Sequence, residues 1–220
     1  MSLMPSNFGW RGYQIKTEMP IRYENLLNKK DDPGGFIKAT KHIEYYIRKT
    51  GDEIKHASNV KASMTEWRTH QKNDYFWKIA NAALYLCQEG MKTKYPLEIG
   101  DCWGALYTKG EHTISHHHFP FVWSFCYYVK VSENTSPLLF ENVMHPKDKN
   151  FITMPIYPKK GDLFIFPSIL RHSVPAQETD EERIMVAGNI WYNFKSENID
   201  IAKINADCKF IVQDNLEITK

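Results

Sequence analysis

Three consecutive histidines, His116-His117-His118, are the residues whose type and spacing most directly suggest chemistry in this sequence. Imidazole is a common ligand of first-row transition metals. If the run lies on a strand, His116 and His118 point to one side and His117 to the other, because side chains alternate along a strand. Two imidazoles at this spacing can bind one metal ion. The alternative is a solvated polar loop, and a register error of one residue would exchange His116 for His117.

A distant histidine supplies the third ligand that such a site needs. His172 follows the segment 161–167, in which a Gly-Asp turn starts an apolar strand and Pro167 ends it. In a facial triad, two metal ligands come from neighbouring positions of one strand and the third comes from elsewhere in the fold. We therefore expect His116, His118 and His172 to bind one metal ion.

Arg183 is the candidate for binding an anion beside this metal. It lies eleven positions after His172, at the start of an aromatic segment, 183–194. On a neighbouring antiparallel strand, this offset can place the guanidinium deep in the same barrel. A buried guanidinium needs an anionic partner, and its planar fork suits a carboxylate. The alternative is a surface ion pair with Glu181 or Glu182.

The segments that must position these side chains are short and rich in β-branched and aromatic residues. After Pro96 they occur at 97–107, 122–131, 151–156, 162–166 and 183–194. Clusters of Gly, Pro, Asn and Asp separate them, which favours a sandwich or barrel over a parallel α/β sheet. The histidines fall between these strands or at their ends, where the mouth of a barrel presents ligands.

Two segments before the strands have helical periodicity. Apolar residues recur at helical spacing over 37–51 and again, more strongly, over 73–88. Asn73 is the expected N-cap of the second helix, and Gly90 is its expected C′ residue. We expect both helices to pack on the outside of a sheet.

Composition indicates an ordinary globular domain. The chain has 220 residues, of which 42% are hydrophobic and 25% charged, and its net charge is +2. This charge gives no case for a nucleic-acid partner or an anionic membrane. No apolar run is long enough to span a membrane, and the N-terminus does not resemble a signal peptide. The four cysteines are scattered, so we expect reduced thiols and a cytoplasmic location.

The stretch from Trp103 to Asn189 resembles the 2-oxoglutarate–Fe(II) oxygenase superfamily, in particular the small oxygenases of bacteria and marine phages. Two motifs of that group read roughly W…G…HxHP…SGVYYV and GDLxxFPSxLxHxV…RxSxxxN. The first is matched by Trp103, Gly110, His116, His118, Ser124, Tyr127, Tyr128 and Val129. The second is matched by Gly161, Asp162, Leu163, Phe166, Pro167, Ser168, Leu170, His172, Val174, Arg183 and Asn189.

This resemblance implies a mainly β fold with flanking helices, built on a double-stranded β-helix, that is, a cupin-like jelly roll. The expected parts are an N-terminal helical and mixed segment, an oxygenase core and a C-terminal extension, at 1–95, 96–194 and 195–220. The implied cofactors are Fe(II) and the co-substrate 2-oxoglutarate. The implied reaction is hydroxylation of a small molecule or a protein side chain by O₂, with release of succinate and CO₂, in the cytoplasm of a bacterium or of a phage-infected cell.

The resemblance also assigns roles to residues beyond the three histidines. Arg183 would bind the 5-carboxylate of 2-oxoglutarate, and Asn189 belongs to the same motif. Met185 replaces the motif serine, whose hydroxyl would bond to that carboxylate. Tyr107, Tyr128 and Ser173 are the candidate replacements. An aromatic wall around the site is expected from Trp123, Tyr128, Phe164 and Trp191.

Two other functions fit the same pattern. One is a three-histidine cupin-type dioxygenase or isomerase that uses no 2-oxoglutarate, and only Arg183 argues against it. The other is a non-catalytic metal-binding jelly roll. A halogenase is disfavoured, because such sites leave the middle ligand position to a halide, whereas His118 offers a side chain there. The sequence leaves open the substrate and the oligomeric state, for which a homodimer is one option.

Overall fold

The computed structural model describes residues 2–10, 13–28, 32–91, 96–141 and 153–193. Among these residues the strands form two sheets, one of seven strands and one of five. In spatial order, the larger sheet contains β1 (Ser2–Trp10), β2 (Tyr13–Asn25), β10 (Asp162–Pro167), β7 (Trp123–Lys130), β12 (Arg183–Tyr192), β5 (Leu97–Tyr107) and β4 (Ser63–Met64). The smaller sheet contains β3 (Val60–Lys61), β6 (His112–His116), β11 (His172–Val174), β8 (Leu138–Phe140) and β9 (Met154–Ile156).

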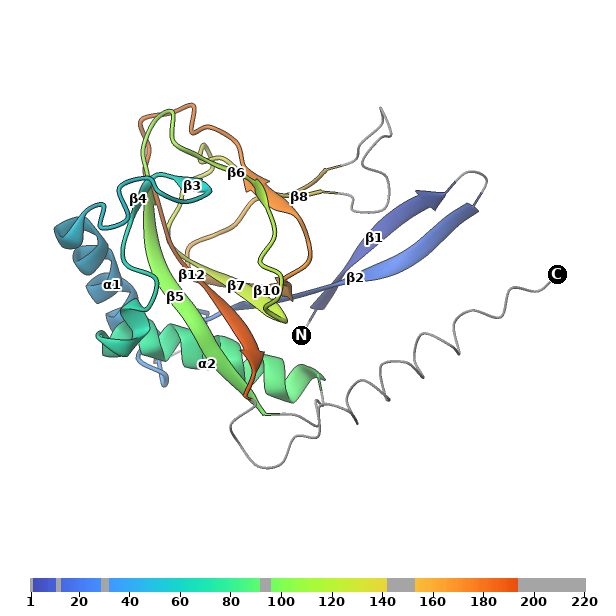
Figure 1. Cartoon of the computed structure of the whole chain (residues 1–220), viewed down its shortest axis with the longest axis horizontal. Helices are drawn as coiled ribbons and strands as arrows, with labels where there is room; N and C mark the ends of the chain where they lie inside the picture. The colour runs from blue at the N-terminus through green and yellow to red at the C-terminus, as the bar shows by residue number, and fades with distance from the viewer. Residues whose placement is uncertain (1, 11–12, 29–31, 92–95, 142–152, 194–220) are drawn as a thin grey trace.

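The two long helices cover the outer face of the larger sheet, as the periodicity predicted (Figure 1). They are α1 (Phe36–Thr50) and α2 (Asp74–Met91), and a short 3-10 helix, η1 (Thr69–Gln71), precedes α2. Asn73 caps α2, because its Oδ1 accepts the backbone N–H of Tyr75 at 3.0 Å. The expectation for Gly90 is wrong: α2 continues through it to Met91.

Strand β12 separates two apolar cores, because its successive side chains point to opposite faces. Ile184 and Val186 pack in the core beneath the helices, whereas Met185 packs in the core between the two sheets. Arg183 is on the same side as Met185 and faces Tyr107 of β5 in the antiparallel register. This alternation directs polar side chains of β12 into the space between the sheets.

The larger sheet also includes a strand that we did not expect from the sequence. β2 pairs with β10, with Asn25 opposite Asp162 and Arg22 opposite Ile165. Figure 1 shows the β1–β2 hairpin reaching beyond the rest of the sheet. The β2 sequence does carry the signal of a strand, because Tyr13, Ile15, Met19, Ile21 and Tyr23 alternate with polar residues and with Pro20, which is unusual inside a strand. Segments 1–95 and 96–194 thus share this sheet, while 195–220 lies outside the described residues.

The strands β5, β7, β9, β10 and β12 occur where the sequence indicated, whereas β1, β3, β4 and β8 were not predicted, and β6 contains only His116 of the three consecutive histidines. Three of the cysteines, Cys87, Cys102 and Cys126, are buried free thiols. Cys208 lies outside the described residues. Within the part of the chain that the structure describes, no helix combines the length and the apolar character needed to cross a membrane.

The close packing of β12 against its neighbours gives a first prediction. A Cβ atom on Gly188 would lie 2.4 Å from Phe125 Cζ and 2.5 Å from the Asp101 carbonyl oxygen. Because one of these atoms belongs to a paired strand, Gly188→Ala should lower the free energy of unfolding by about 3 kcal/mol in urea denaturation. Gly51→Ala is the control, because nothing lies within 4 Å of its Cβ and only its φ of +65° is unfavourable; it should cost about 1 kcal/mol. Equal losses would contradict the packing argument.

Candidate active site

The side chains of His116, His118 and His172 converge, and their ligand atoms all lie within 4.8 Å of one another. His116 ends β6 and His172 begins β11, and the two residues face each other across the antiparallel pair. His118 follows β6 by two residues, and its backbone N–H is held by the Ser168 carbonyl oxygen at 2.8 Å. His117 is exposed and lies outside this cluster.

Backbone carbonyl groups determine which ring nitrogen is free in two of these histidines. The Nδ1 atom of His116 lies 2.7 Å from the Ile114 oxygen, and that of His172 lies 2.9 Å from the Leu170 oxygen. A carbonyl oxygen can only accept, so each Nδ1 carries the hydrogen and each Nε2 keeps its lone pair. The Nε2 atoms of His116 and His118 are 3.2 Å apart. Rings oriented in this way by a hydrogen bond at Nδ1 are typical of metal ligands.

Burial keeps the three imidazoles neutral. Burial, and after it the nearby ring of His116, lowers the pKa of His172 to about 3. Burial lowers the pKa of His118 to about 2, with added repulsion from His172 and His116. Burial also lowers the pKa of His116. The neutral form is the one that binds a metal ion, so the cluster does not have to lose protons at neutral pH before it binds one.

Arg183 is fully buried and lines the same cavity as the three histidines. Its Nη1 donates to the Ser136 carbonyl oxygen at 2.7 Å, and its Nη2 donates to the Tyr128 hydroxyl at 3.1 Å. Its Nε has no hydrogen-bond partner among the described residues. No Asp or Glu of the described chain forms an ion pair with it. Within the part of the chain that the structure describes, the guanidinium is therefore a buried cation without an anionic partner.

Two tyrosines lie against this guanidinium. The ring centroids of Tyr107 and Tyr128 are 5.4 Å and 5.1 Å from Arg183 Cζ, close enough for cation–π attraction. The Tyr107 hydroxyl shares a 2.7 Å hydrogen bond with Thr113. Burial raises the pKa of both tyrosines, so their hydroxyls stay protonated and can donate to an anion. Met185, which stands where the motif has serine, places its sulfur 3.9 Å from Arg183 Nη2.

Two other expected site residues are not brought to the cavity. Ser173 alternates along β11 with His172 and Val174, which both line the cavity, so its side chain points to the opposite face. Asn189 is buried beside the cavity wall, where its Oδ1 accepts from Ser124 at 2.9 Å.

The expected aromatic wall is only partly present. Tyr128 and Phe164 lie in the core between the sheets, but Trp123 packs in the core under the helices and Trp191 is 37% exposed. Trp103 lines the cavity instead, with its ring centroid 5.9 Å from that of His118. Trp103 lies four residues before Tyr107 on β5, so the two side chains point to the same face of the sheet. This spacing could have identified Trp103 from the sequence.

One cavity therefore combines two unsatisfied groups of opposite character. The imidazole lone pairs suit a divalent cation, and the guanidinium, which lines the same cavity, suits a carboxylate. The buried Nε of Arg183 that has no partner is the observation that most directly indicates an anionic ligand. The residues present thus fit a metal ion together with a small carboxylic acid.

The family comparison agrees with this chemistry. Residues 101–189 match the family described as "Putative 2OG-Fe(II) oxygenase", and this segment contains the three histidines and Arg183. Among curated proteins, none is significantly similar to the sequence.

Several solved structures share the fold. The α-ketoglutarate-dependent epimerase SnoN from nogalamycin biosynthesis is 13% identical, with a TM-score of 0.61 over 77% of this chain and 76% of SnoN. SnoN has also been solved with Fe³⁺ and α-ketoglutarate. A Pseudomonas putida prolyl-4-hydroxylase is 14% identical, with a TM-score of 0.57 over 79% of this chain and 92% of that enzyme. A collagen prolyl hydroxylase of Paramecium Bursaria Chlorella virus-1, solved in complex with 2-oxoglutarate, is 14% identical, with a TM-score of 0.55 over 77% of this chain and 94% of that enzyme.

At these identities the structural likeness establishes the fold, which is the expected double-stranded β-helix. Residues 101–189, which contain the three histidines and Arg183, match the model of the 2-oxoglutarate–Fe(II) oxygenase family, and the three-histidine cluster fits the iron of that family.

Proposed function

We propose that the chain hydroxylates a C–H bond of an organic substrate, with Fe(II) held by His116, His118 and His172 and 2-oxoglutarate held by Arg183. The observation that carries this proposal is the fully buried guanidinium without an anion, in one cavity with three neutral imidazoles. Bound together, Fe(II) and 2-oxoglutarate supply the activation of O₂, in which 2-oxoglutarate is converted to succinate and CO₂.

The histidines act as ligands through their unprotonated nitrogens. The carbonyl oxygens of Ile114 and Leu170 fix the rings of His116 and His172, so little conformational freedom is lost when the metal ion binds. Trp103 adds an apolar wall that keeps water from the reacting centre.

Arg183 binds the 5-carboxylate of the co-substrate through its guanidinium edge. Tyr128 is the residue we propose in place of the motif serine, because its hydroxyl already lies 3.1 Å from Arg183 Nη2 and keeps its proton. Tyr107 supports the cation through its ring face. Tyr128 does not itself line the cavity, but it bonds to Arg183, which does. The proposal does not use Ser173 or Asn189, since among the described residues neither lines the cavity or bonds to Arg183.

Hydroxylation, rather than another oxidation, is the reaction we infer for this site. Two of the solved relatives are prolyl hydroxylases, and a third is an epimerase. The substrate is an organic molecule or a protein side chain that reaches the cavity together with O₂. A three-histidine dioxygenase without 2-oxoglutarate would leave Arg183 buried without an anion, so we do not favour it.

Succinate formation tests this function. The Fe(II)-loaded protein should release succinate only when both O₂ and 2-oxoglutarate are supplied. Without the organic substrate this release should be slow, but it should still depend on both. His118→Ala should abolish the release, because it removes a ligand. His117→Ala, from the same run but exposed, should retain it. Oxygen consumption that does not depend on 2-oxoglutarate would contradict the proposal.

Arg183→Met separates binding from folding. Methionine fills similar space without charge, so the dissociation constant for 2-oxoglutarate should rise roughly 100-fold or more in calorimetric titrations. The free energy of unfolding of the ligand-free protein should stay the same or rise, because a buried charge without an anion costs free energy that methionine does not. A large loss of stability with unchanged 2-oxoglutarate binding would show that Arg183 is structural.

The neutral histidines predict a pH dependence of the metal-free protein. In the unfolded chain their pKa is about 6.5, whereas in the folded chain that of His172 is about 3 and that of His118 about 2. The unfolded chain therefore binds more protons between these values. The contribution of these histidines to the free energy of unfolding should be fully present above about pH 6.5. Below that pH, the free energy of unfolding should fall by about 1.4 kcal/mol per pH unit for each histidine.

Urea unfolding of chelator-treated protein at several pH values measures this slope. His172→Phe should reduce the slope of the free energy of unfolding against pH by the contribution of one histidine. His117→Ala should leave this slope unchanged. A slope that His172→Phe does not alter would contradict the assignment of a neutral, buried His172.

A further inference from the structure

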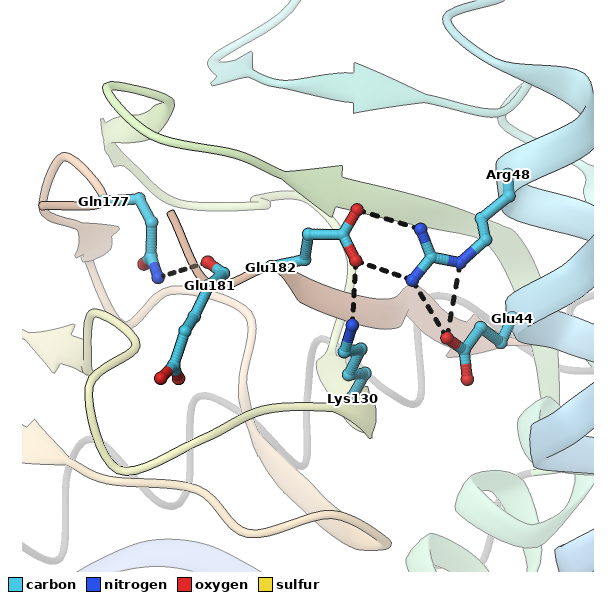
Figure 2. Close-up of polar contacts among 6 residues, drawn as sticks. All are labelled: Glu44, Arg48, Lys130, Gln177, Glu181 and Glu182. Atoms are coloured by element: carbon cyan, nitrogen blue, oxygen red, sulfur yellow. Dashed lines mark hydrogen bonds and ion pairs between the residues drawn. The ribbon is translucent and has the colours of Figure 1, made fainter. Parts of the chain in front are cut away.

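Gln177 is a buried polar residue that lies outside the cavity, with 2% of its surface exposed. Its Oε1 accepts the backbone N–H of Ser136 at 2.9 Å, and its Nε2 donates to the Glu181 carbonyl oxygen at 2.9 Å. Figure 2 shows the second of these bonds. The Gln177 backbone is fixed as well, because it accepts from Gly110 at 2.7 Å and donates to Glu111 at 2.9 Å. The amide is therefore rigidly placed between two chain segments.

The two short hydrogen bonds of the Gln177 side chain join it to groups that position Arg183, and its third contact, with Thr179 Oγ1, is weak at 3.5 Å. Ser136 provides the carbonyl oxygen that accepts from Arg183 Nη1 at 2.7 Å, so holding the Ser136 N–H also holds this acceptor. Glu181 precedes Arg183 by two residues, so its bond to Gln177 anchors the chain where β12 begins. One amide thus fixes both the head group of Arg183 and the backbone that carries it.

A second anchor lies on the solvent side of the same turn, toward α1. Glu182 accepts from Arg48 at 2.6 Å and 2.9 Å and from Lys130 at 2.9 Å (Figure 2). The hydrogen bonds from Arg48 and then Lys130 lower the pKa of Glu182 to about 2. These side chains are partly exposed, and ion pairs in water contribute little to stability. The buried bonds of Gln177 are therefore the stronger constraint on Arg183.

We propose that Gln177 is a positioning residue for 2-oxoglutarate, which it does not touch: it holds Arg183 in the orientation that receives the 5-carboxylate. The inference rests on the proposed function of Arg183. A guanidinium pairs well with a carboxylate only when its planar fork is aligned with the two oxygens. Without Gln177, the Ser136 N–H loses its partner and the arginine must be ordered when the co-substrate binds, which weakens binding.

Gln177→Met removes both hydrogen bonds and keeps a side chain of similar size. Calorimetric titration of the anaerobic Mn(II)-loaded protein with 2-oxoglutarate should show a dissociation constant about 10-fold higher than that of the wild type. In the Fe(II) enzyme, KM for 2-oxoglutarate should rise similarly while kcat stays the same. Thr135→Val is the matched control, because Thr135 is a buried residue of the same loop whose hydroxyl makes a partly buried 2.8 Å hydrogen bond to Ser132, and no contact with Arg183 is seen among the described residues. It should leave binding unchanged.

A second background shows whether Gln177 acts through Arg183. Arg183→Lys keeps the charge but lacks the planar fork, so adding Gln177→Met to it should weaken binding by less than about 2-fold. An unchanged dissociation constant for Gln177→Met would overturn the inference, as would an effect matched by Thr135→Val or one that persists fully beside Arg183→Lys. Wild-type protein that fails to bind 2-oxoglutarate at all would instead overturn the proposed function, and this inference with it.

Discussion

A charge removed from water needs a partner of opposite sign, because an unpaired ion in a protein interior costs several kcal/mol of free energy. Arg183 is 0% exposed, and the described residues offer it only neutral acceptors: the Ser136 carbonyl, the Tyr128 hydroxyl and the Met185 sulfur. Two aromatic faces offset part of the cost. The remaining cost of burying the charge favours an anionic ligand in the cavity. The location of this one guanidinium thus determines where the co-substrate can bind in the proposed mechanism.

Strand geometry places this cation and the metal ligands in the same cavity. Arg183 belongs to the larger sheet, whereas His116 and His172 face each other across two strands of the smaller sheet. Because the inner faces of both sheets enclose one apolar core, their polar side chains meet inside it. A dicarboxylic acid suits such a cavity, since one of its ends can meet the metal ion while the other meets the guanidinium. The alternation along β12 is essential, because a shift of one residue would direct Arg183 toward the helices.

The parts that could be predicted from the sequence depend on local pattern. The helices and the strands β5, β7, β9, β10 and β12 follow from the spacing and type of apolar residues, whereas His118 lies two residues beyond β6 and is placed by its backbone bond to Ser168. Alternation along a strand could have excluded Ser173, which is adjacent to His172, and could have identified β2. Partners far apart in the chain were not predictable: the pairing of β2 with β10 joins distant segments, and the role of Gln177 depends on a loop 41 residues away. Tyr128 could be chosen over the other candidate hydroxyls only once the Arg183 side chain was located.

Optical titration of the anaerobic Fe(II) protein with 2-oxoglutarate tests the central claim most directly. It reports in a single spectrum whether iron and the co-substrate bind at the same place. The account predicts that a weak visible charge-transfer band develops and saturates as 2-oxoglutarate is added, and that it is absent when zinc replaces iron. Tight binding of iron without any such band at saturating 2-oxoglutarate would contradict the claim that one cavity binds both.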